Sequence, residues 1–131
     1  MKLLTIKDAN NVIETLPFVP DIFYFDEKSA GAKYLASFFR KFGTRIFFEP
    51  SSINSKSDLS YVEVSDIIKF SEEDIPNANF ANLFRNKLFI QTLGEKGLKF
   101  KLGDGDWVLV PPVANENCID AEGAGDWTSA T

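Results

Sequence analysis

The chain of 131 residues has the size of one domain, and its 44% apolar content, including 13 phenylalanines, is enough to form a buried core. This composition excludes a disordered chain. The net charge is −5, and no basic residue follows Lys101. An acidic chain without a basic cluster argues against nucleic acid as a partner. We therefore expect residues 1–131 to form one domain.

The residue types that the sequence lacks exclude several kinds of catalytic and metal-binding site. The sequence has no histidine, which excludes a serine–histidine–aspartate triad and histidine-ligated zinc. Its one cysteine, Cys118, can form neither an internal disulfide nor a cysteine metal site. No apolar stretch is long enough to span a membrane, and the first residues are not typical of a signal peptide. The sequence thus predicts a cytoplasmic protein with no membrane partner.

The first two elements differ in their periodicity. Residues 5–15 predict a short helix that begins with a capping box of Thr5 and Asp8. Residues 22–25 are a continuous apolar and aromatic run, which is typical of a strand buried on both faces in a parallel sheet.

A second helix follows, with Ser29 as its N-cap and Gly43 at its C-terminal end. Its phenylalanines at positions 38, 39 and 42 recur at helical spacing, so we expect all three to face the core. Residues 45–49 then predict a second buried strand. Strand, helix and strand within about 30 residues form a βαβ unit.

The rest of the chain predicts more strands. Residues 50–60 are rich in Ser, Asn, Asp and Lys and are expected to form a loop. Residues 66–70 and 88–92 predict two strands, with a short helix near residues 80–84 between them. Alternation from Leu98 and the turn residues that follow predict an antiparallel hairpin with residues 107–110. The fold class is α/β, with a mostly parallel sheet, helices on its faces and a late antiparallel hairpin.

A glycine-rich segment near the end carries the clearest chemical signal. Gly123, Ala124 and Gly125 allow close approach of the backbone to a ligand, and Asp126 follows them directly. If a helix starts here, its free N–H groups bind an anion and the carboxylate can accept a proton from an attacking hydroxyl. The alternative is an ordinary tight turn with an acidic residue in the first turn of a helix.

The order of motifs resembles a known family. A predicted strand ends in Thr92-Leu93-Gly94-Glu95-Lys96-Gly97, and Asp120-Ala121-Glu122-Gly123-Ala124-Gly125-Asp126 follows about 30 residues later. This arrangement resembles the C-terminal part of the ribokinase-like (PfkB-type) carbohydrate kinases, whose signatures are T-L-G-x-x-G and D-T-x-G-A-G-D. The resemblance covers the chain from about Asp21 to its end.

The resemblance implies a Rossmann-like fold, ATP and Mg²⁺ as cofactors, and a sugar as substrate. Asp126 matches the family's catalytic base, and the backbone of residues 123–125 matches its anion hole. The segment that lines the nucleotide is matched by Thr92, Leu93, Gly94 and Gly97.

Three positions depart from the family pattern. Ala121 stands where the family has threonine. The magnesium-organising N-x-x-E element becomes Ser71-Glu72-Glu73-Asp74, which would place Ser71 near the nucleotide and Asp74 near the metal. An equally strong alternative makes this segment a helix N-terminus capped by Ser71. Glu49-Pro50-Ser51 lies where many members carry D-x-N.

Family members are about twice as long, and their sugar-binding residues lie in a preceding half. The sequence is therefore expected to be a truncated portion that is inactive alone and self-associates through exposed sheet edges. Two alternatives remain open, a nucleotide-binding module without catalysis and a structural domain in which the glycine-rich segment is only a turn.

Overall fold

The computed structural model describes residues 3–112. Its helices are α1 (Ile6–Thr15), α2 (Ala30–Arg40) and α3 (Lys56–Glu63), with short 3-10 helices η1 (Asn79–Leu83) and η2 (Gly94–Lys96). Its strands are β1 (Ile22–Phe25), β2 (Arg45–Phe48), β3 (Ile67–Ser71), β4 (Leu88–Thr92), β5 (Leu98–Leu102) and β6 (Val108–Val110). Within this part of the chain, no helix has both the length and the apolar character needed to cross a membrane.

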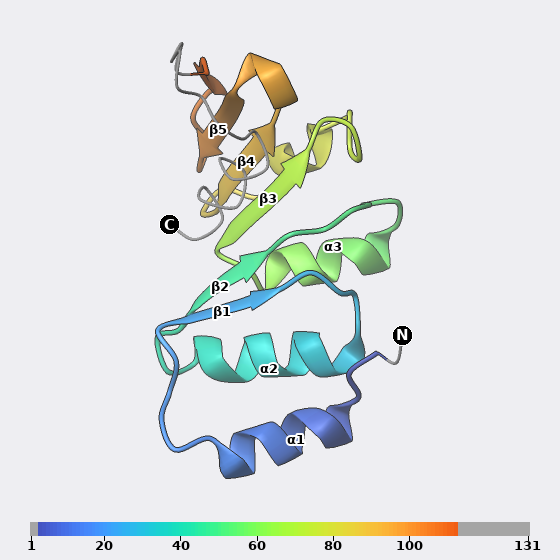
Figure 1. The fold of residues 1–131 in the computed structure, drawn as a ribbon, viewed down its shortest axis with the longest axis vertical. Helices are drawn as coiled ribbons and strands as arrows, with labels where there is room; N and C mark the ends of the chain where they lie inside the picture. The colour runs from blue at the N-terminus through green and yellow to red at the C-terminus, as the bar shows by residue number, and fades with distance from the viewer. Residues whose placement is uncertain (1–2, 113–131) are drawn as a thin grey trace.

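The strands form one sheet whose spatial order, β1-β2-β3-β4-β5-β6, is the order of the chain. Strands β1 to β4 are parallel, whereas β5 and β6 are each antiparallel to the strand before them. Helices α2 and α3 lie along the same face of the sheet, and α1 packs outside α2 (Figure 1). This architecture confirms the expected mostly parallel α/β fold with a late antiparallel hairpin.

The first two helices begin as their sequences predict. The Thr5 hydroxyl accepts a hydrogen bond from the Asp8 N–H at 3.1 Å, and the Asp8 carboxylate accepts one from the Thr5 N–H at 3.1 Å. Ser29 caps α2 by accepting from the Ala32 N–H. Gly31 donates to the Leu4 carbonyl at 3.0 Å and lies so close to that backbone that any larger residue would collide with it. This close approach holds the start of α1 against α2.

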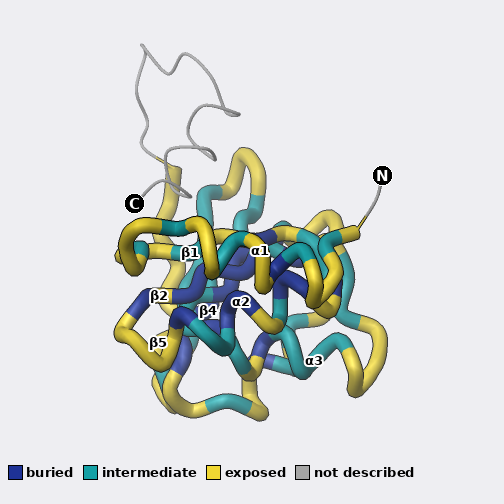
Figure 2. Tube along the Cα trace, turned by 90° about the horizontal axis from the view of Figure 1, so that it is seen from below, coloured by how far each residue is buried: buried dark blue, intermediate teal, exposed yellow. Residues whose placement is uncertain are grey.

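The core lies between the sheet and the helices. Alternate strand side chains point toward α2 and α3, as shown by the ring contacts of Phe23 with Phe39 and of Phe48 with Tyr61. Phe25 and Phe48 stack with ring centroids 4.6 Å apart. The buried segments of the sheet and of α2 occupy the middle of the molecule (Figure 2). Fully buried side chains from three strands line this face: Ile46, Phe48, Ile68, Phe70 and Phe89.

The opposite side of the sheet, which we call the second face, has no helix over it among residues 3–112. The strand registers assign to it the side chains that alternate with the core set. They are Ile22, Tyr24, Arg45, Phe47, Ile67, Lys69, Ser71, Leu88, Ile90, Thr92, Leu98, Phe100, Leu102, Val108 and Val110. Phe47 is buried near the centre, whereas Ile22 is 56% exposed on β1 and Leu102 is 67% exposed on β5.

Two predictions about burial are wrong. Residues 22–25 form the expected strand, but Ile22 and Tyr24 are exposed because β1 is an edge strand and no described helix covers its second face. Phe42 is 58% exposed rather than facing the core, since α2 ends at Arg40. Its ring nevertheless contacts that of Phe38, with centroids 5.2 Å apart.

The loop expected for residues 50–60 is also wrong, because α3 begins at Lys56. Ser55 provides the N-cap by accepting from the Asp58 N–H. The helix buries only Val62 completely, so its sequence is polar and lacks a clear apolar stripe.

The remaining elements agree closely with the sequence. Strand β4 matches its predicted bounds, β3 begins one residue later than expected, and β6 begins at Val108 rather than at Trp107. The predicted short helix near residues 80–84 is the 3-10 helix η1. Its Phe80 packs on Phe70 and Phe89, on the face that carries the core.

Candidate functional site at the carboxyl edge

The carboxyl ends of β3 and β4 lie side by side. Ser71 and Thr92 are register partners, and the Glu72 N–H continues the ladder by donating to the Thr92 carbonyl at 2.9 Å. Beyond β4 the same row continues through Leu98 to Val110, the last residue of β6. The ends of three strands and the start of β5 therefore share one edge of the sheet, where ligands of open α/β sheets bind.

The chain after β3 forms a capped turn. The Ser71 hydroxyl accepts a hydrogen bond from the Asp74 N–H at 3.1 Å, and the Ser71 carbonyl accepts one from the Ile75 N–H at 2.9 Å. The Gln91 side chain on β4 donates to the Ile75 carbonyl at 3.1 Å and fixes the end of the turn to the sheet. Ser71 thus acts as a cap, but no helix follows it directly, so a helix N-terminus at this position is wrong.

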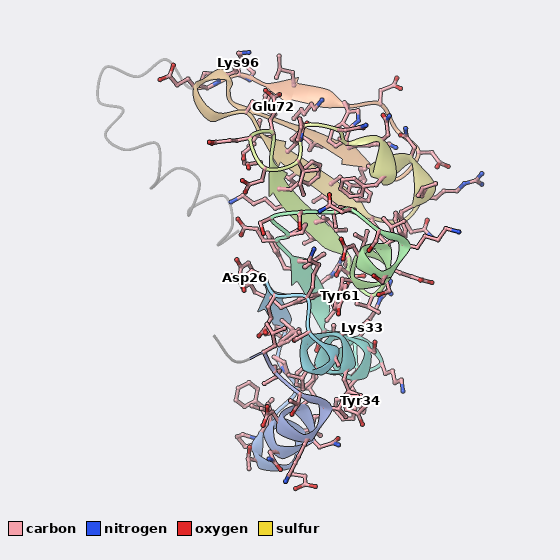
Figure 3. All side chains as sticks on the ribbon, turned by 90° about the vertical axis from the view of Figure 1, so that its right-hand side faces the viewer. Asp26, Lys33, Tyr34, Tyr61, Glu72 and Lys96 are labelled. Atoms are coloured by element: carbon pink, nitrogen blue, oxygen red, sulfur yellow. The ribbon has the colours of Figure 1, made fainter. Side chains whose placement is uncertain are left out.

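The chain after β4 is a tight glycine-containing loop. The Leu93 N–H donates to the Gly97 carbonyl at 2.8 Å, which closes the loop around η2. Gly94 has a φ of +61°, and no atom would meet a Cβ placed on it. The backbone at Gly94 is therefore open to a ligand. Glu72 and Lys96 stand at this same end of the sheet (Figure 3).

Gly97 has a different role from Gly94. Its φ is +96°, and a Cβ there would collide with the Val110 carbonyl oxygen and lie 2.9 Å from the Pro112 nitrogen. Glycine is required because the T-L-G-x-x-G segment and the end of β6 are in contact. The chain consequently passes beside this loop just before residue 113.

A second group of polar side chains lies near the carboxyl ends of β1 and β2. The Tyr24 hydroxyl donates to a Glu49 carboxylate oxygen at 2.9 Å, and the Lys69 ammonium lies 4.0 Å from the other Glu49 oxygen. Burial, followed by the hydrogen bond with Glu49, raises the pKa of Tyr24 well above its usual range. The phenol therefore remains a neutral hydrogen-bond donor at physiological pH.

The loops after β1 and β2 are tied together by Lys28. Its ammonium donates to the Ser52 hydroxyl at 2.8 Å and lies 3.2 Å from the Asp58 carboxylate. The Asn54 N–H donates to the same carboxylate, and this bond, ahead of the Lys28 contacts, lowers the pKa of Asp58. These contacts hold the carboxyl edge of the first two strands in a fixed shape.

The donor set fits a nucleotide better than a fully protein-bound metal. Open backbone at Gly94 and hydroxyls at Ser71 and Thr92 can contact phosphates or a ribose. No three acidic or sulfur-containing side chains within residues 3–112 come together as a metal site. Mg²⁺ commonly keeps several waters and takes one or two carboxylates together with substrate phosphates, so Asp74 alone is compatible with it.

The structure brings five of the expected residues to this edge, at the ends of β3 and β4 and in the loop after β4: Ser71, Thr92, Leu93, Gly94 and Gly97. Asp74 lies in the turn after β3. Asp126 and residues 123–125 lie outside the described residues. Sequence reasoning singled out Glu49 but missed its partners Tyr24 and Lys69, and the available signal was Lys69, a charged residue within an apolar strand pattern.

No family model matches the chain, and the comparison with curated proteins found no match. Among solved structures, it is similar to Arabidopsis thaliana ribokinase complexed with ribose and ATP, with a TM-score of 0.62 and 14% sequence identity. The match covers 95% of this chain and 43% of that chain. The likeness shows a ribokinase-like α/β fold, and the chain spans less than half the length of that ribokinase.

Proposed function

We propose that this chain is the nucleotide-binding portion of a carbohydrate kinase, which transfers the γ-phosphoryl group of ATP to a sugar hydroxyl. The observation that carries the proposal is the row from Ser71 through Thr92 to Val110. The T-L-G-x-x-G loop and the point where the chain continues toward residues 123–126 lie at one edge of the sheet. Residue 123 is 13 positions beyond Val110, and an extended chain of that length reaches up to ~45 Å.

In this proposal the loop from Thr92 to Gly97 lines the nucleotide. The backbone N–H groups of residues 123–125 stabilise charge on the transferring phosphoryl group, and Asp126 accepts the proton of the attacking hydroxyl. The hydroxyl oxygen bonds to the γ-phosphorus as the bond to the bridging oxygen of ADP breaks. Mg²⁺, oriented through Asp74 and Ser71, would neutralise charge on the phosphates.

The proposal assigns nucleotide binding, not turnover, to this chain alone, since it spans less than half of the solved ribokinase. The ribokinase-like fold supports this role, because the solved ribokinase to which the chain is similar is complexed with ATP. A nucleotide-binding module without catalysis is the alternative. Substitution of Asp126 by asparagine should leave nucleotide affinity nearly unchanged under either alternative, because the proposed base contacts the hydroxyl and not the nucleotide.

The test is thermal unfolding with and without excess MgATP or MgADP. Nucleotide at about a hundredfold excess over its dissociation constant stabilises the folded state by about 2.7 kcal/mol. Two glycines with positive φ and open surroundings provide matched variants, Gly94→Asn at the carboxyl edge and Gly43→Asn at the opposite edge. Both should lower the basal melting temperature, but only Gly94→Asn should reduce the nucleotide-induced shift. Equal shifts in the two variants would contradict binding at this loop.

A further inference from the structure

Most side chains on the second face of the sheet are apolar, and no described helix covers it. Parallel strands occur almost only in sheets that are covered on both faces, because their side chains are apolar on both. Large exposed side chains remain at its two ends, Ile22 and Tyr24 on β1 and Leu102, Val108 and Val110 on β5 and β6. An apolar face of this extent requires a partner.

The two ends of the second face differ in charge. Near β1 and β2, Asp26 and Glu49 place carboxylates beside Tyr24, which contributes to the raised pKa of that phenol. Over β3 to β6, Lys69 is the one charged side chain that the registers assign to this face. The carboxyl ends of β1 and β2 therefore disfavour an acidic partner, although Arg45 lies at the other end of β2, whereas β3 to β6 carry no carboxylate on this face.

The sequence after Pro112 has the matching character. Its 19 residues contain four acidic side chains, at positions 116, 120, 122 and 126, and no basic one. Apolar residues are interspersed among them, including Val113, Cys118, Ile119 and Trp127. The segment follows directly from β6, whose Val108 and Val110 belong to the second face.

The distances also agree. The distance across the sheet from β6 to β3 is three strand spacings, or about 14 Å. Seven extended residues span up to ~24 Å, so residues 113–119 are long enough to cross β5 and β4. We propose that the second face over β3 to β5 is the docking surface for residues 113–131 of the same chain. This proposal concerns an interaction surface and does not depend on kinase activity.

The full chain offers a direct test through its single cysteine. A nitroxide attached to Cys118 broadens NMR signals of nearby methyl groups, and the effect falls steeply with distance. Methyl signals of Leu88, Ile90 and Leu98 on the second face should lose most of their intensity. Those of Val62 and Ile68, on the face that carries the core, should keep most of theirs.

Two controls separate the possible outcomes. In Cys118→Ser/Asn115→Cys the nitroxide is attached at a position that is polar in the natural sequence. The same pattern of broadening should therefore appear even if labelling at Cys118 disturbs the packing there. In Cys118→Ser/Leu109→Cys the label lies on the other side of β6, so the amide signal of its register partner Lys99 should be broadened while the second-face methyls keep most of their intensity.

In a further experiment, nitroxide-labelled chain is mixed with isotope-enriched chain that carries no nitroxide. Broadening that appears only when the enriched molecule itself carries the nitroxide supports the proposal. Broadening of the enriched copy would show that a second chain covers the face and would overturn it. Loss of intensity that is equal on both faces, or absent from both, would also overturn it.

Discussion

The parallel part of the sheet, β1 to β4, and the hairpin of β5 and β6 bury different kinds of side chain. The parallel part contributes Phe25, Ile46, Phe48 and their buried neighbours to the core. The hairpin contributes no buried apolar residue, and its buried side chain is Lys101, whose ammonium donates to Asn82 at 2.8 Å. Lys99 lies over the Trp107 ring, 5.0 Å from its centroid.

This difference separates two tasks. The parallel part is stabilised by packing between the sheet and the helices, and both partners of this packing belong to residues 3–112. The hairpin is held by strand pairing and by lysine side chains, and the apolar residues of β5 and β6 other than Leu109 lie on the second face. The candidate nucleotide loop, residues 93–97, joins the two parts. Its geometry therefore depends on a well-packed sheet on one side and a lightly packed hairpin on the other.

The largest effect that would sharpen this comparison is expected from Phe48→Ala. Phe48 is fully buried and stacks on Phe25, so its removal should cost about 3–5 kcal/mol of unfolding free energy. Phe100→Ala, at a half-buried position of the hairpin, should cost less than half as much. Urea unfolding of both variants measures the two losses. Equal losses would break the distinction between the two parts.

Gly97→Ala should have the next largest effect, at the contact between the nucleotide loop and the hairpin. A left-handed backbone costs a residue other than glycine about 1–2 kcal/mol, and the new methyl group would also collide with the Val110 carbonyl. Gly43→Ala provides the control, with positive φ but no nearby atom. We expect Gly97→Ala to destabilise more and to speed amide exchange in β6. A larger loss for Gly43→Ala would contradict the contact.

The smallest effect concerns two carboxylates, one in each part. Asp58 has a pKa held below its ordinary value of 3.8, whereas Asp104 is highly exposed and lies 3.8 Å from Arg85. At pH 7, Asp58→Asn should cost about 1 kcal/mol and Asp104→Asn less than about 0.5 kcal/mol. Because the folded-state pKa of Asp58 is lowered, its contribution exists above pH 3.8 and disappears as pH falls through the folded pKa.

Unfolding of the wild type and the two variants between pH 7 and pH 2 tests this sign. The difference between wild type and Asp58→Asn should shrink in acid, and the Asp104→Asn difference should stay small throughout. If the difference in unfolding free energy between wild type and Asp58→Asn widens as pH falls, the lowered pKa of Asp58 is refuted.

Much of the fold was predictable because local signals and tertiary packing agree. The aromatic run at residues 22–25 and the apolar run at 88–92 are strands in the structure, and Ser29 caps the helix it was expected to cap. Helix α3 was missed because its stability comes from a cap and from Val62 alone, which leaves a polar sequence. Exposure of Tyr24 was missed because it depends on which strand forms the edge.

The candidate site was predictable only in part. Ser71 and Thr92 could be expected together because both end adjacent parallel strands. The contacts of Glu49 with Tyr24 and Lys69 join three strands. No single segment of the sequence reveals how these three strands are aligned with one another. The collision that makes Gly97 necessary depends on where β6 ends, which is set by the hairpin.

The identity of strand order and chain order has a consequence for synthesis. Each strand pairs with the one made just before it, so no strand must be inserted between two that have already paired. A chain emerging from the ribosome with its N-terminus first can extend these six strands one at a time, always at the edge formed by the newest strand. Loop closure between neighbours stays short at every step, which favours rapid folding. The last of the described strands to emerge, β6, is also the least buried of the six, so the described sheet ends on its most exposed strand.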